Sequence, residues 1–178
     1  MVREEVTYRR GVAADAGDLA AFGSQSFVDA YGTTSSRRAM ALHVASTYSA
    51  DLQRAELEDP ESWTIVGDRD GEIVAAALMQ WHEPPLPIDP PAKWAAIRRF
   101  YLGRAYWRTG VSTDLKVAAL QSIRDGGGDA VWLQAWEHAP QAIGFYRKWG
   151  FREAGHVPFR LGTELQRDIL LARTLTTS

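Results

Sequence analysis

The stretch AVWLQAWEHAPQAIGFYRKWGF (130–151) reads as a β-strand followed directly by an α-helix. Its first part, 130–137, is a short apolar run, which is typical of a buried strand. Pro140 suits the first position of a helix, because its φ fits the helix and its missing N–H needs no partner there. Gly150 suits the end of that helix. The stretch therefore predicts one strand–helix unit of an α/β fold.

A second strand–turn–helix unit comes directly before it. Residues 94–102 (WAAIRRFYL) predict a strand, and a helix with an apolar stripe begins near Gly110 and stops at the glycines 126–128. If the two strands pair in parallel, their carboxyl ends form one crevice, with the turn 106–115 (YWRTGVSTDL) beside it. The free amides at a helix start make this turn a candidate anion site.

The remainder of the sequence completes a single mixed α/β domain over residues 1–178. Arg-Asp-Gly (69–71) between two apolar runs predicts a hairpin, and the proline-rich stretch 83–91 predicts a loop. A helix capped by Asp15 is expected through residues 18–32, and a second helical region over 37–58 is broken near Ser49–Asp51. The predicted strands are 4–10, 62–68, 72–81, 94–102, 130–137, 151–161 and 165–174.

Composition excludes several classes of protein. The chain has no apolar run of about 18 residues, so it predicts no transmembrane helix, and the charged start MVREEVTYRR lacks a signal region. We therefore expect a cytoplasmic protein. The absence of cysteine removes disulfides, thiolate metal sites and a cysteine nucleophile. A net charge of −2 gives no electrostatic reason to expect nucleic acid or an anionic membrane as a partner.

The turn 106–115 matches neither GxxxxGK(S/T) nor GxGxxG, so the common nucleotide loops are disfavoured. Arg108 adds a charge that suits a diphosphate, and Ser112 and Thr113 add hydroxyl donors. Asp114 favours the helix dipole but repels an anion. A capped surface turn explains the same residues, so the turn alone leaves both interpretations open.

The strand–helix unit at 130–151 resembles the second motif of the GNAT N-acetyltransferase superfamily, which usually reads N-P-x-A-x-x-x-Y-x-x-x-G-F. Five positions match in register: Pro140, Ala142, Tyr146, Gly150 and Phe151. The sequence departs from the motif at Ala139, where the family usually has asparagine.

The family's phosphate loop usually reads Q/R-x-x-G-x-G/A, and here only Gly110 matches, between Trp107 and Ser112. The resemblance nevertheless extends over nearly the whole chain. SFVDAYG (26–32) and the tail 159–175 look like a branch that includes polyamine N-acetyltransferases related to a bacterial sporulation regulator.

The resemblance implies a mostly antiparallel central sheet with one splayed parallel strand pair, flanked by helices. It also implies acetyl-CoA as co-substrate, with its pantetheine along the strand 97–102 and its pyrophosphate on the amides of 108–113, and no metal. The residues expected to bind the cofactor are Phe100, Tyr101, Leu102, Arg108, Thr109, Gly110, Val111, Ser112, Thr113, Ala139, Phe145 and Tyr146.

The activity implied is direct acetyl transfer to a primary amine. Such a reaction needs a neutral amine, a donor for the oxyanion and an acid for the thiolate. A backbone amide near Tyr101–Leu102 is the oxyanion candidate, and Tyr146 is the acid candidate, although its helix also reads as an ordinary buried stripe. The carboxylate that many relatives carry in the strand 94–102 aligns with Ala96.

Substitutes for this missing base are His82, Glu83 and His138, of which Glu83 and His138 are the preferred candidates. Each of these residues also has an ordinary structural interpretation. The resemblance further allows a homodimer through edge strands and an exchanged last hairpin.

The acceptor is expected to contact residues 27–40, the loop 83–93 and the last hairpin. Glu164 and Asp168 would suit a cationic acceptor, whereas Arg37 and Arg38 would suit an amine that bears an acid, provided that they face the pocket. Two other classes of function stay open from the sequence: a non-catalytic protein that senses acyl-CoA, and a structural domain that has lost CoA.

Overall fold

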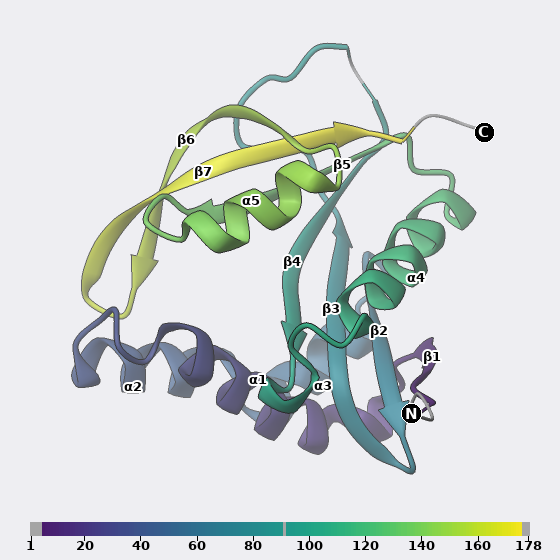
Figure 1. Cartoon of the computed structure of the whole chain (residues 1–178), viewed down its shortest axis with the longest axis vertical. Helices are drawn as coiled ribbons and strands as arrows, with labels where there is room; N and C mark the ends of the chain where they lie inside the picture. The colour runs from purple at the N-terminus through teal and green to yellow at the C-terminus, as the bar shows by residue number, and fades with distance from the viewer. Residues whose placement is uncertain (1–4, 91, 176–178) are drawn as a thin grey trace.

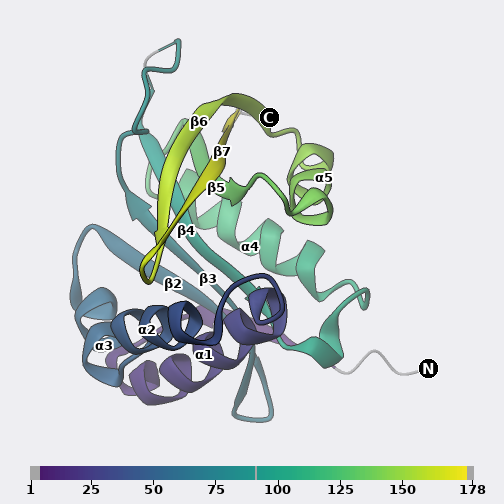
Figure 2. The same ribbon diagram turned by 90° about the vertical axis from the view of Figure 1, so that its left-hand side faces the viewer.

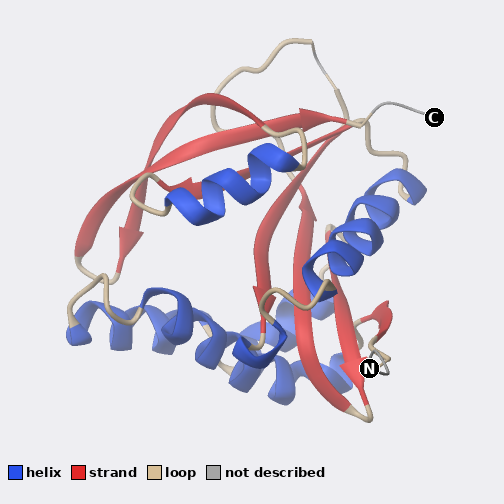
Figure 3. Cartoon of the chain, viewed as in Figure 1, coloured by secondary structure: helices blue, strands red, loops and turns tan. Residues whose placement is uncertain are grey.

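A seven-stranded sheet with the order β1-β2-β3-β4-β5-β7-β6 runs through the molecule (Figures 1 and 3). The computed structural model describes residues 5–90 and 92–175. The strands are β1 (Thr7–Arg10), β2 (Ser62–Arg69), β3 (Glu72–Trp81), β4 (Trp94–Leu102), β5 (Ala130–Trp136), β6 (Arg152–Leu161) and β7 (Glu164–Thr174). The helices are α1 (Ala16–Tyr31), α2 (Arg37–Thr47), α3 (Ala50–Glu58), α4 (Val111–Asp125) and α5 (Pro140–Lys148), with short 3-10 turns η1 (Ala13–Asp15) and η2 (Arg104–Tyr106).

The pairing of the strands is antiparallel throughout this sheet except between β4 and β5. The tight turn between β2 and β3 has positive φ at Asp70 (53°) and Gly71 (85°), which confirms the hairpin predicted at Arg-Asp-Gly. β7 lies between β5 and β6, so the last hairpin joins the sheet through its second strand. The predicted fold, mostly antiparallel with one parallel pair, is confirmed.

Two layers of helices cover the sheet (Figure 2). Helices α1 to α3 lie on one face, and α4 and α5 lie on the other. The apolar stripe of α4 is fully buried at Leu115, Ala119 and Ile123 and belongs to the main core with Met79 of β3. No helix within the described ranges is long and apolar enough to cross a membrane.

Asp15 precedes α1 but does not cap it; its carboxylate instead binds the Arg9 guanidinium at 2.8 and 2.9 Å, because a charged partner from β1 lies within reach. The break predicted near Ser49–Asp51 is confirmed: α2 ends at Thr47, and the Ser49 hydroxyl accepts a hydrogen bond from the Leu52 amide at the start of α3. Residue 4 of the predicted first strand and residue 91 of the proline-rich loop lie outside the described residues.

Strands β4 and β5 stay paired over only three residues before they diverge (Figure 1). Trp94, Ala95 and Ala96 face Ala130, Val131 and Trp132; beyond them, β4 pairs with β3 alone and β5 with β7 alone. A bulge in β4 brings Ile97 opposite Met79 and Arg99 opposite Leu78, which leaves Arg98 between them without a partner on β3. One backbone edge of β4 beyond Ala96 is therefore free of strand pairing.

Candidate active site

A cavity of about 440 Å³ lies where β4 and β5 diverge. Its wall combines both layers of the molecule, with residues from the three N-terminal helices, from α5 and from the six strands β2 to β7. The side chains that matter for its chemistry are Tyr31, His43, Glu56, Arg98, Arg99, Tyr101, Gln134, Tyr146, Gln166 and Asp168.

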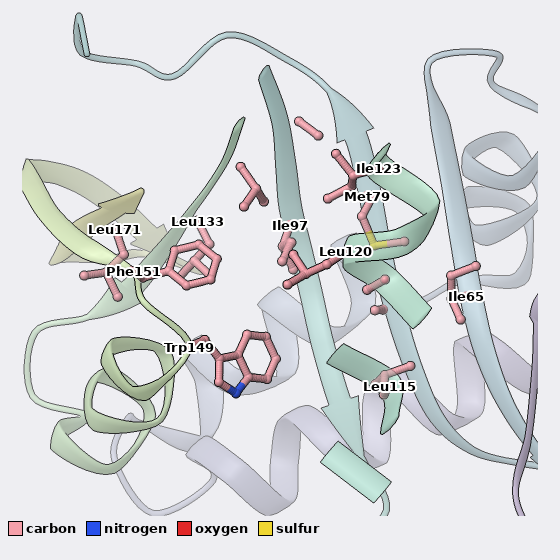
Figure 4. Packing of buried hydrophobic residues seen from close by; sticks show 14 of the residues in the cluster. Ile65, Met79, Ile97, Leu115, Leu120, Ile123, Leu133, Trp149, Phe151 and Leu171 are labelled. Carbon is pink, nitrogen blue, oxygen red and sulfur yellow. The ribbon is translucent and has the colours of Figure 1, made fainter. Parts of the chain in front are cut away.

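The side of this cleft that faces α5 is apolar. Figure 4 shows Phe151 near Leu133 of β5 and Trp149 between α5 and β4, and all three belong to one buried cluster with Ile97 of β4. The rings of Phe100 and Trp149 meet edge to face at 5.0 Å between centroids. Packing of this kind holds the two diverging strands apart without closing the gap with backbone hydrogen bonds.

Tyr146 projects from α5 into the cavity. Its ring packs edge to face against Trp149 and Phe151, at 5.4 and 5.8 Å between centroids. Its hydroxyl makes no hydrogen bond to another described residue. Burial, and to a smaller degree the phenol of Tyr31, raise the pKa of Tyr146 above its usual value. The phenol therefore keeps its proton at neutral pH and can act as a proton donor.

Asp168 of β7 is the buried carboxylate of the cavity, only 5% exposed. It lies opposite Trp136 of β5 and Val157 of β6. Its Oδ1 atom has no hydrogen-bond partner within the described part of the chain. Burial, and then the charge of Glu137, raise the pKa of Asp168 to about 6.

Two arginines of β4 reach the same cavity but differ in their partners. Arg99 forms two hydrogen bonds to the Glu56 carboxylate of α3, at 2.6 and 2.9 Å, so its charge is balanced. Arg98 is exposed and makes no hydrogen bond or ion pair with any other described residue. Partial desolvation at the cavity wall, and then the charge of Arg99, lower the pKa of the Arg98 guanidinium, and the charge of Glu56 opposes this shift.

A pair of tyrosines closes the cavity between α2 and β4. The hydroxyls of Tyr48 and Tyr101 lie 2.5 Å apart, and Arg99 lies 5.3 Å from the Tyr48 ring centroid. Nearby, burial and the charge of Arg99 lower the pKa of His43. The imidazole of His43 is therefore neutral at neutral pH, and it stacks on Phe27 at 4.4 Å between centroids.

The turn before α4 has the backbone of an anion site. Gly110 has a φ of 96° and Arg108 a φ of 64°. The first hydrogen bond of the helix runs from the Thr113 amide to the Gly110 carbonyl, at 2.9 Å. The amides of Val111 and Ser112 lie before this bond and are free to bind an anion.

Trp107, the unusual residue of this turn, is 45% exposed. Its indole nitrogen donates a hydrogen bond to the Leu102 carbonyl at 3.2 Å, and the guanidinium of Arg104 lies 5.9 Å from its ring centroid. The ring is therefore held against the end of β4.

The candidate bases named from sequence lie outside the cavity. His82 and Glu83 are exposed beyond the end of β3, near the paired start of β4, and the His82 carbonyl accepts the Trp132 indole N–H. His138 is 70% exposed in its side chain and lies 3.6 Å from Glu137. None of the three lines the cavity, because each belongs to a loop that leads away from it.

Of the residues expected to contact the acceptor, some line the cavity and others do not. Arg37 and Arg38 are exposed and do not line the cavity, and Glu164 accepts a hydrogen bond from the Ser36 amide instead of facing the cavity. The proline-rich loop packs through Leu86 and Ile88 against a separate cluster. The contributions of α1 and the last hairpin, in contrast, are found where they were expected, at Phe27, Tyr31, Phe159, Leu161, Gln166 and Asp168.

Sequence reasoning did not single out Arg98 or His43 as site residues, and it included Tyr31 only as part of the range 27–40. Arg98 stands in an apolar strand and could have been noticed as a charge in a buried run. Nothing local marks His43, because it reaches the cavity through the packing of α2 against the rest of the molecule.

Comparison with known proteins agrees with this geometry. The profile of the acetyltransferase (GNAT) family matches residues 26–151. An uncharacterised N-acetyltransferase of Lactobacillus delbrueckii subsp. lactis is 26% identical over 90% of this chain and 92% of its own. An uncharacterised N-acetyltransferase of Mycobacterium tuberculosis is 30% identical over 75% of this chain and 83% of its own.

Solved structures show the same fold at low sequence identity. The PaiA N-acetyltransferase from Thermoplasma acidophilum, in complex with coenzyme A, superposes with a TM-score of 0.79 at 15% identity, over 96% of this chain and 99% of its own. A GCN5-related N-acetyltransferase from Rhodopseudomonas palustris gives a TM-score of 0.75 at 18% identity, over 98% and 99%. Fold, motif positions and the family match agree, and the chain belongs to the GNAT family of acetyltransferases.

Proposed function

We propose that this protein transfers an acetyl group from acetyl-CoA directly to a primary amine. The observation that carries the proposal is the cavity at the diverging strands, which brings the protonated phenol of Tyr146 and the buried carboxylate of Asp168 into one space. A cysteine-mediated route through an acetyl-enzyme is excluded, because the chain contains no cysteine.

The chain's own groups fit acetyl-CoA. The unpaired edge of β4, at Phe100, Tyr101 and Leu102, can pair with an extended amide-bearing arm such as pantetheine. The free amides of the α4 turn, with the Arg108 side chain, suit a diphosphate. Acetyl-CoA supplies the activated acyl group as a thioester.

Tyr146 is proposed as the acid that protonates the departing sulfur. Its raised pKa keeps the proton in place until a thiolate develops beside it. A backbone amide near Tyr101–Leu102 is proposed to stabilise the oxyanion. Phe145, Thr109, Thr113 and Ala139 complete the proposed cofactor contacts.

The test is thiol release from acetyl-CoA over a panel of primary amines. Because the chain has no cysteine, a thiol reagent reports CoA alone. We expect Tyr146→Phe to lower kcat by about 100-fold, in the range of general acid catalysis, with the Kd for acetyl-CoA unchanged.

Two outcomes would contradict the proposal. Tight binding of acetyl-CoA without thiol release from any amine would favour an acyl-CoA sensor. A loss of acetyl-CoA affinity in a folded Tyr146→Phe variant would make Tyr146 a binding residue and not the acid.

A further inference from the structure

The cavity carries two charged groups of opposite sign that form no ion pair with the described residues. Asp168 is buried, and its Oδ1 atom has no hydrogen-bond partner among those residues. Arg98 lines the same space without a contact ion pair, and the only acid among them whose charge acts on it is Glu56, which is already bound to Arg99. The other charged groups there have partners: Glu56 binds Arg99, and Asp59 accepts hydrogen bonds from the Glu61 amide and the Ser62 hydroxyl. Unpaired charges in a cavity mark the groups that a ligand satisfies.

We propose that the acceptor is a zwitterion, a primary amine that also bears a carboxylate, with its ammonium at Asp168 and its carboxylate at Arg98. The inference rests on the proposed acetyl transfer and adds the substrate class and the base. A polyamine fits less well, because its second ammonium would meet the unpaired guanidinium of Arg98.

The surroundings of Asp168 suit an ammonium. Gln166 lies two residues before Asp168 and also lines the cavity, and Tyr31 and Trp136 offer aromatic rings. Tyr31 and Glu137 interact electrostatically with the Asp168 carboxylate. A cation bound here would find hydrogen-bond acceptors and ring faces in place of the water that it leaves.

The arginine end of the cavity suits a carboxylate. The guanidinium of Arg98 extends from the bulge of β4, where the neighbouring Arg99 is already committed to Glu56. A guanidinium pairs with a carboxylate through two parallel hydrogen bonds. Because Arg98 and Asp168 come from different strands of one sheet, acceptors of one chain length should reach both groups best.

The reaction balances with the groups present. Asp168 takes one proton from the ammonium, and the neutral nitrogen forms a C–N bond to the acetyl carbon as the C–S bond breaks. Tyr146 gives its proton to the sulfur and regains one from the new amide nitrogen. Asp168 then releases its proton to solvent, so each turnover yields an N-acetyl product, free CoA and one proton.

The experiment compares a series of ω-amino carboxylates with alkylamines and diamines of the same chain length. In the wild type, kcat/KM should be at least 10-fold higher for the best amino carboxylate than for its matched alkylamine or diamine. Arg98→Gln should abolish this preference by lowering kcat/KM for the amino carboxylate at least 10-fold more than for the alkylamine. Arg98→Lys should keep part of the preference, and Arg38→Gln, an exposed arginine outside the cavity, should keep all of it.

Asp168→Asn should lower kcat/KM for amino carboxylates and alkylamines alike, with the Kd for acetyl-CoA unchanged. A diamine preferred by the wild type, or a preference retained in Arg98→Gln, would overturn the zwitterion assignment. Full activity of Asp168→Asn would overturn the role of Asp168.

A separate measurement covers the case in which no amine is turned over. Calorimetric titration of the CoA-bound protein with the same amino carboxylates measures the second site without chemistry. Binding that weakens at least 10-fold in Arg98→Gln supports the site even if the proposed transfer fails. No binding, or equal binding in both proteins, overturns it.

Discussion

A carboxylate on a buried strand face, as at Asp168, destabilises the folded protein unless a partner compensates its charge. Its pKa of about 6 lies above the ordinary value of 3.8 for an aspartate. Between these two values the folded chain binds more protons than the unfolded chain, so stability falls as the pH rises through this window. At neutral pH the charge of Asp168 lowers the free energy of unfolding by about 3 kcal/mol, which follows from the size of the pKa shift.

Asp168→Asn should therefore stabilise the protein. We expect a higher Tm than wild type at pH 7.5 and a much smaller difference at pH 4, because the wild-type carboxylate is protonated there. Thermal unfolding at both pH values measures this. A lower Tm at both would show that Asp168 holds the fold together and was not retained for chemistry.

The matched control is Asp15, whose pKa is lowered and not raised, so its charge has the opposite effect on stability. Hydrogen bonds from Arg9 lower the pKa of Asp15, so its charge stabilises the folded state above the ordinary pKa of an aspartate. Asp15→Asn should lower the Tm at pH 7.5, and the difference should shrink as the pH falls through the lowered pKa. The two variants together separate a buried charge kept for a ligand from one kept for structure.

At the scale of elements, the proposed diphosphate site lies at the start of α4 and depends on Gly110. The turn has fewer glycines than the family's usual loop, but the one position with a φ of 96° is a glycine. A side chain there would strain the backbone by about 1–2 kcal/mol. Ser112 follows in the helix proper, where a small side chain needs no special backbone.

Gly110→Ala should weaken acetyl-CoA binding by about 10-fold. The backbone would relieve the strain of about 1–2 kcal/mol by shifting the free amides of Val111 and Ser112 away from the positions that bind the diphosphate. Calorimetry with acetyl-CoA measures the change. Gly17→Ala is the control, since Gly17 lies in α1 and a methyl group there meets no neighbouring atom; it should leave affinity unchanged. Equal affinity for wild type and Gly110→Ala would show that the turn does not hold the diphosphate.

At the scale of the whole molecule, two parts of one sheet are joined across three residue pairs between β4 and β5. β1 to β4 form one part with α4, whereas β5, β7 and β6 form the other. Core residues such as Ile97 and Leu133 belong to the same cluster across this junction. A ligand that pairs with the free edge of β4 would add contacts where the sheet has fewest.

Acetyl-CoA should accordingly raise the Tm in a concentration-dependent way. At 100 times Kd the stabilisation is about 2.7 kcal/mol, which corresponds to roughly 5–10 °C for a chain of this length. Thermal unfolding with increasing acetyl-CoA measures it. An adenosine diphosphate without the pantetheine arm should give a smaller shift, and equal shifts would argue that the space between β4 and β5 is not used.

The sequence by itself determined the elements and the family. Local signals set where helices and strands begin and end. In this chain they are the periodicity of apolar residues, the Arg-Asp-Gly turn, the glycines 126–128 that end a helix, and the spacing of Pro140, Tyr146 and Gly150. The tertiary structure decided the site. His82, Glu83 and His138 are ordinary candidates by residue type, yet their loops carry them outside the cavity, whereas Asp168 enters it because β7 lies next to β5. Burial and unpaired charge arise only when distant strands meet, because they depend on what surrounds a side chain in space and not on its neighbours along the chain.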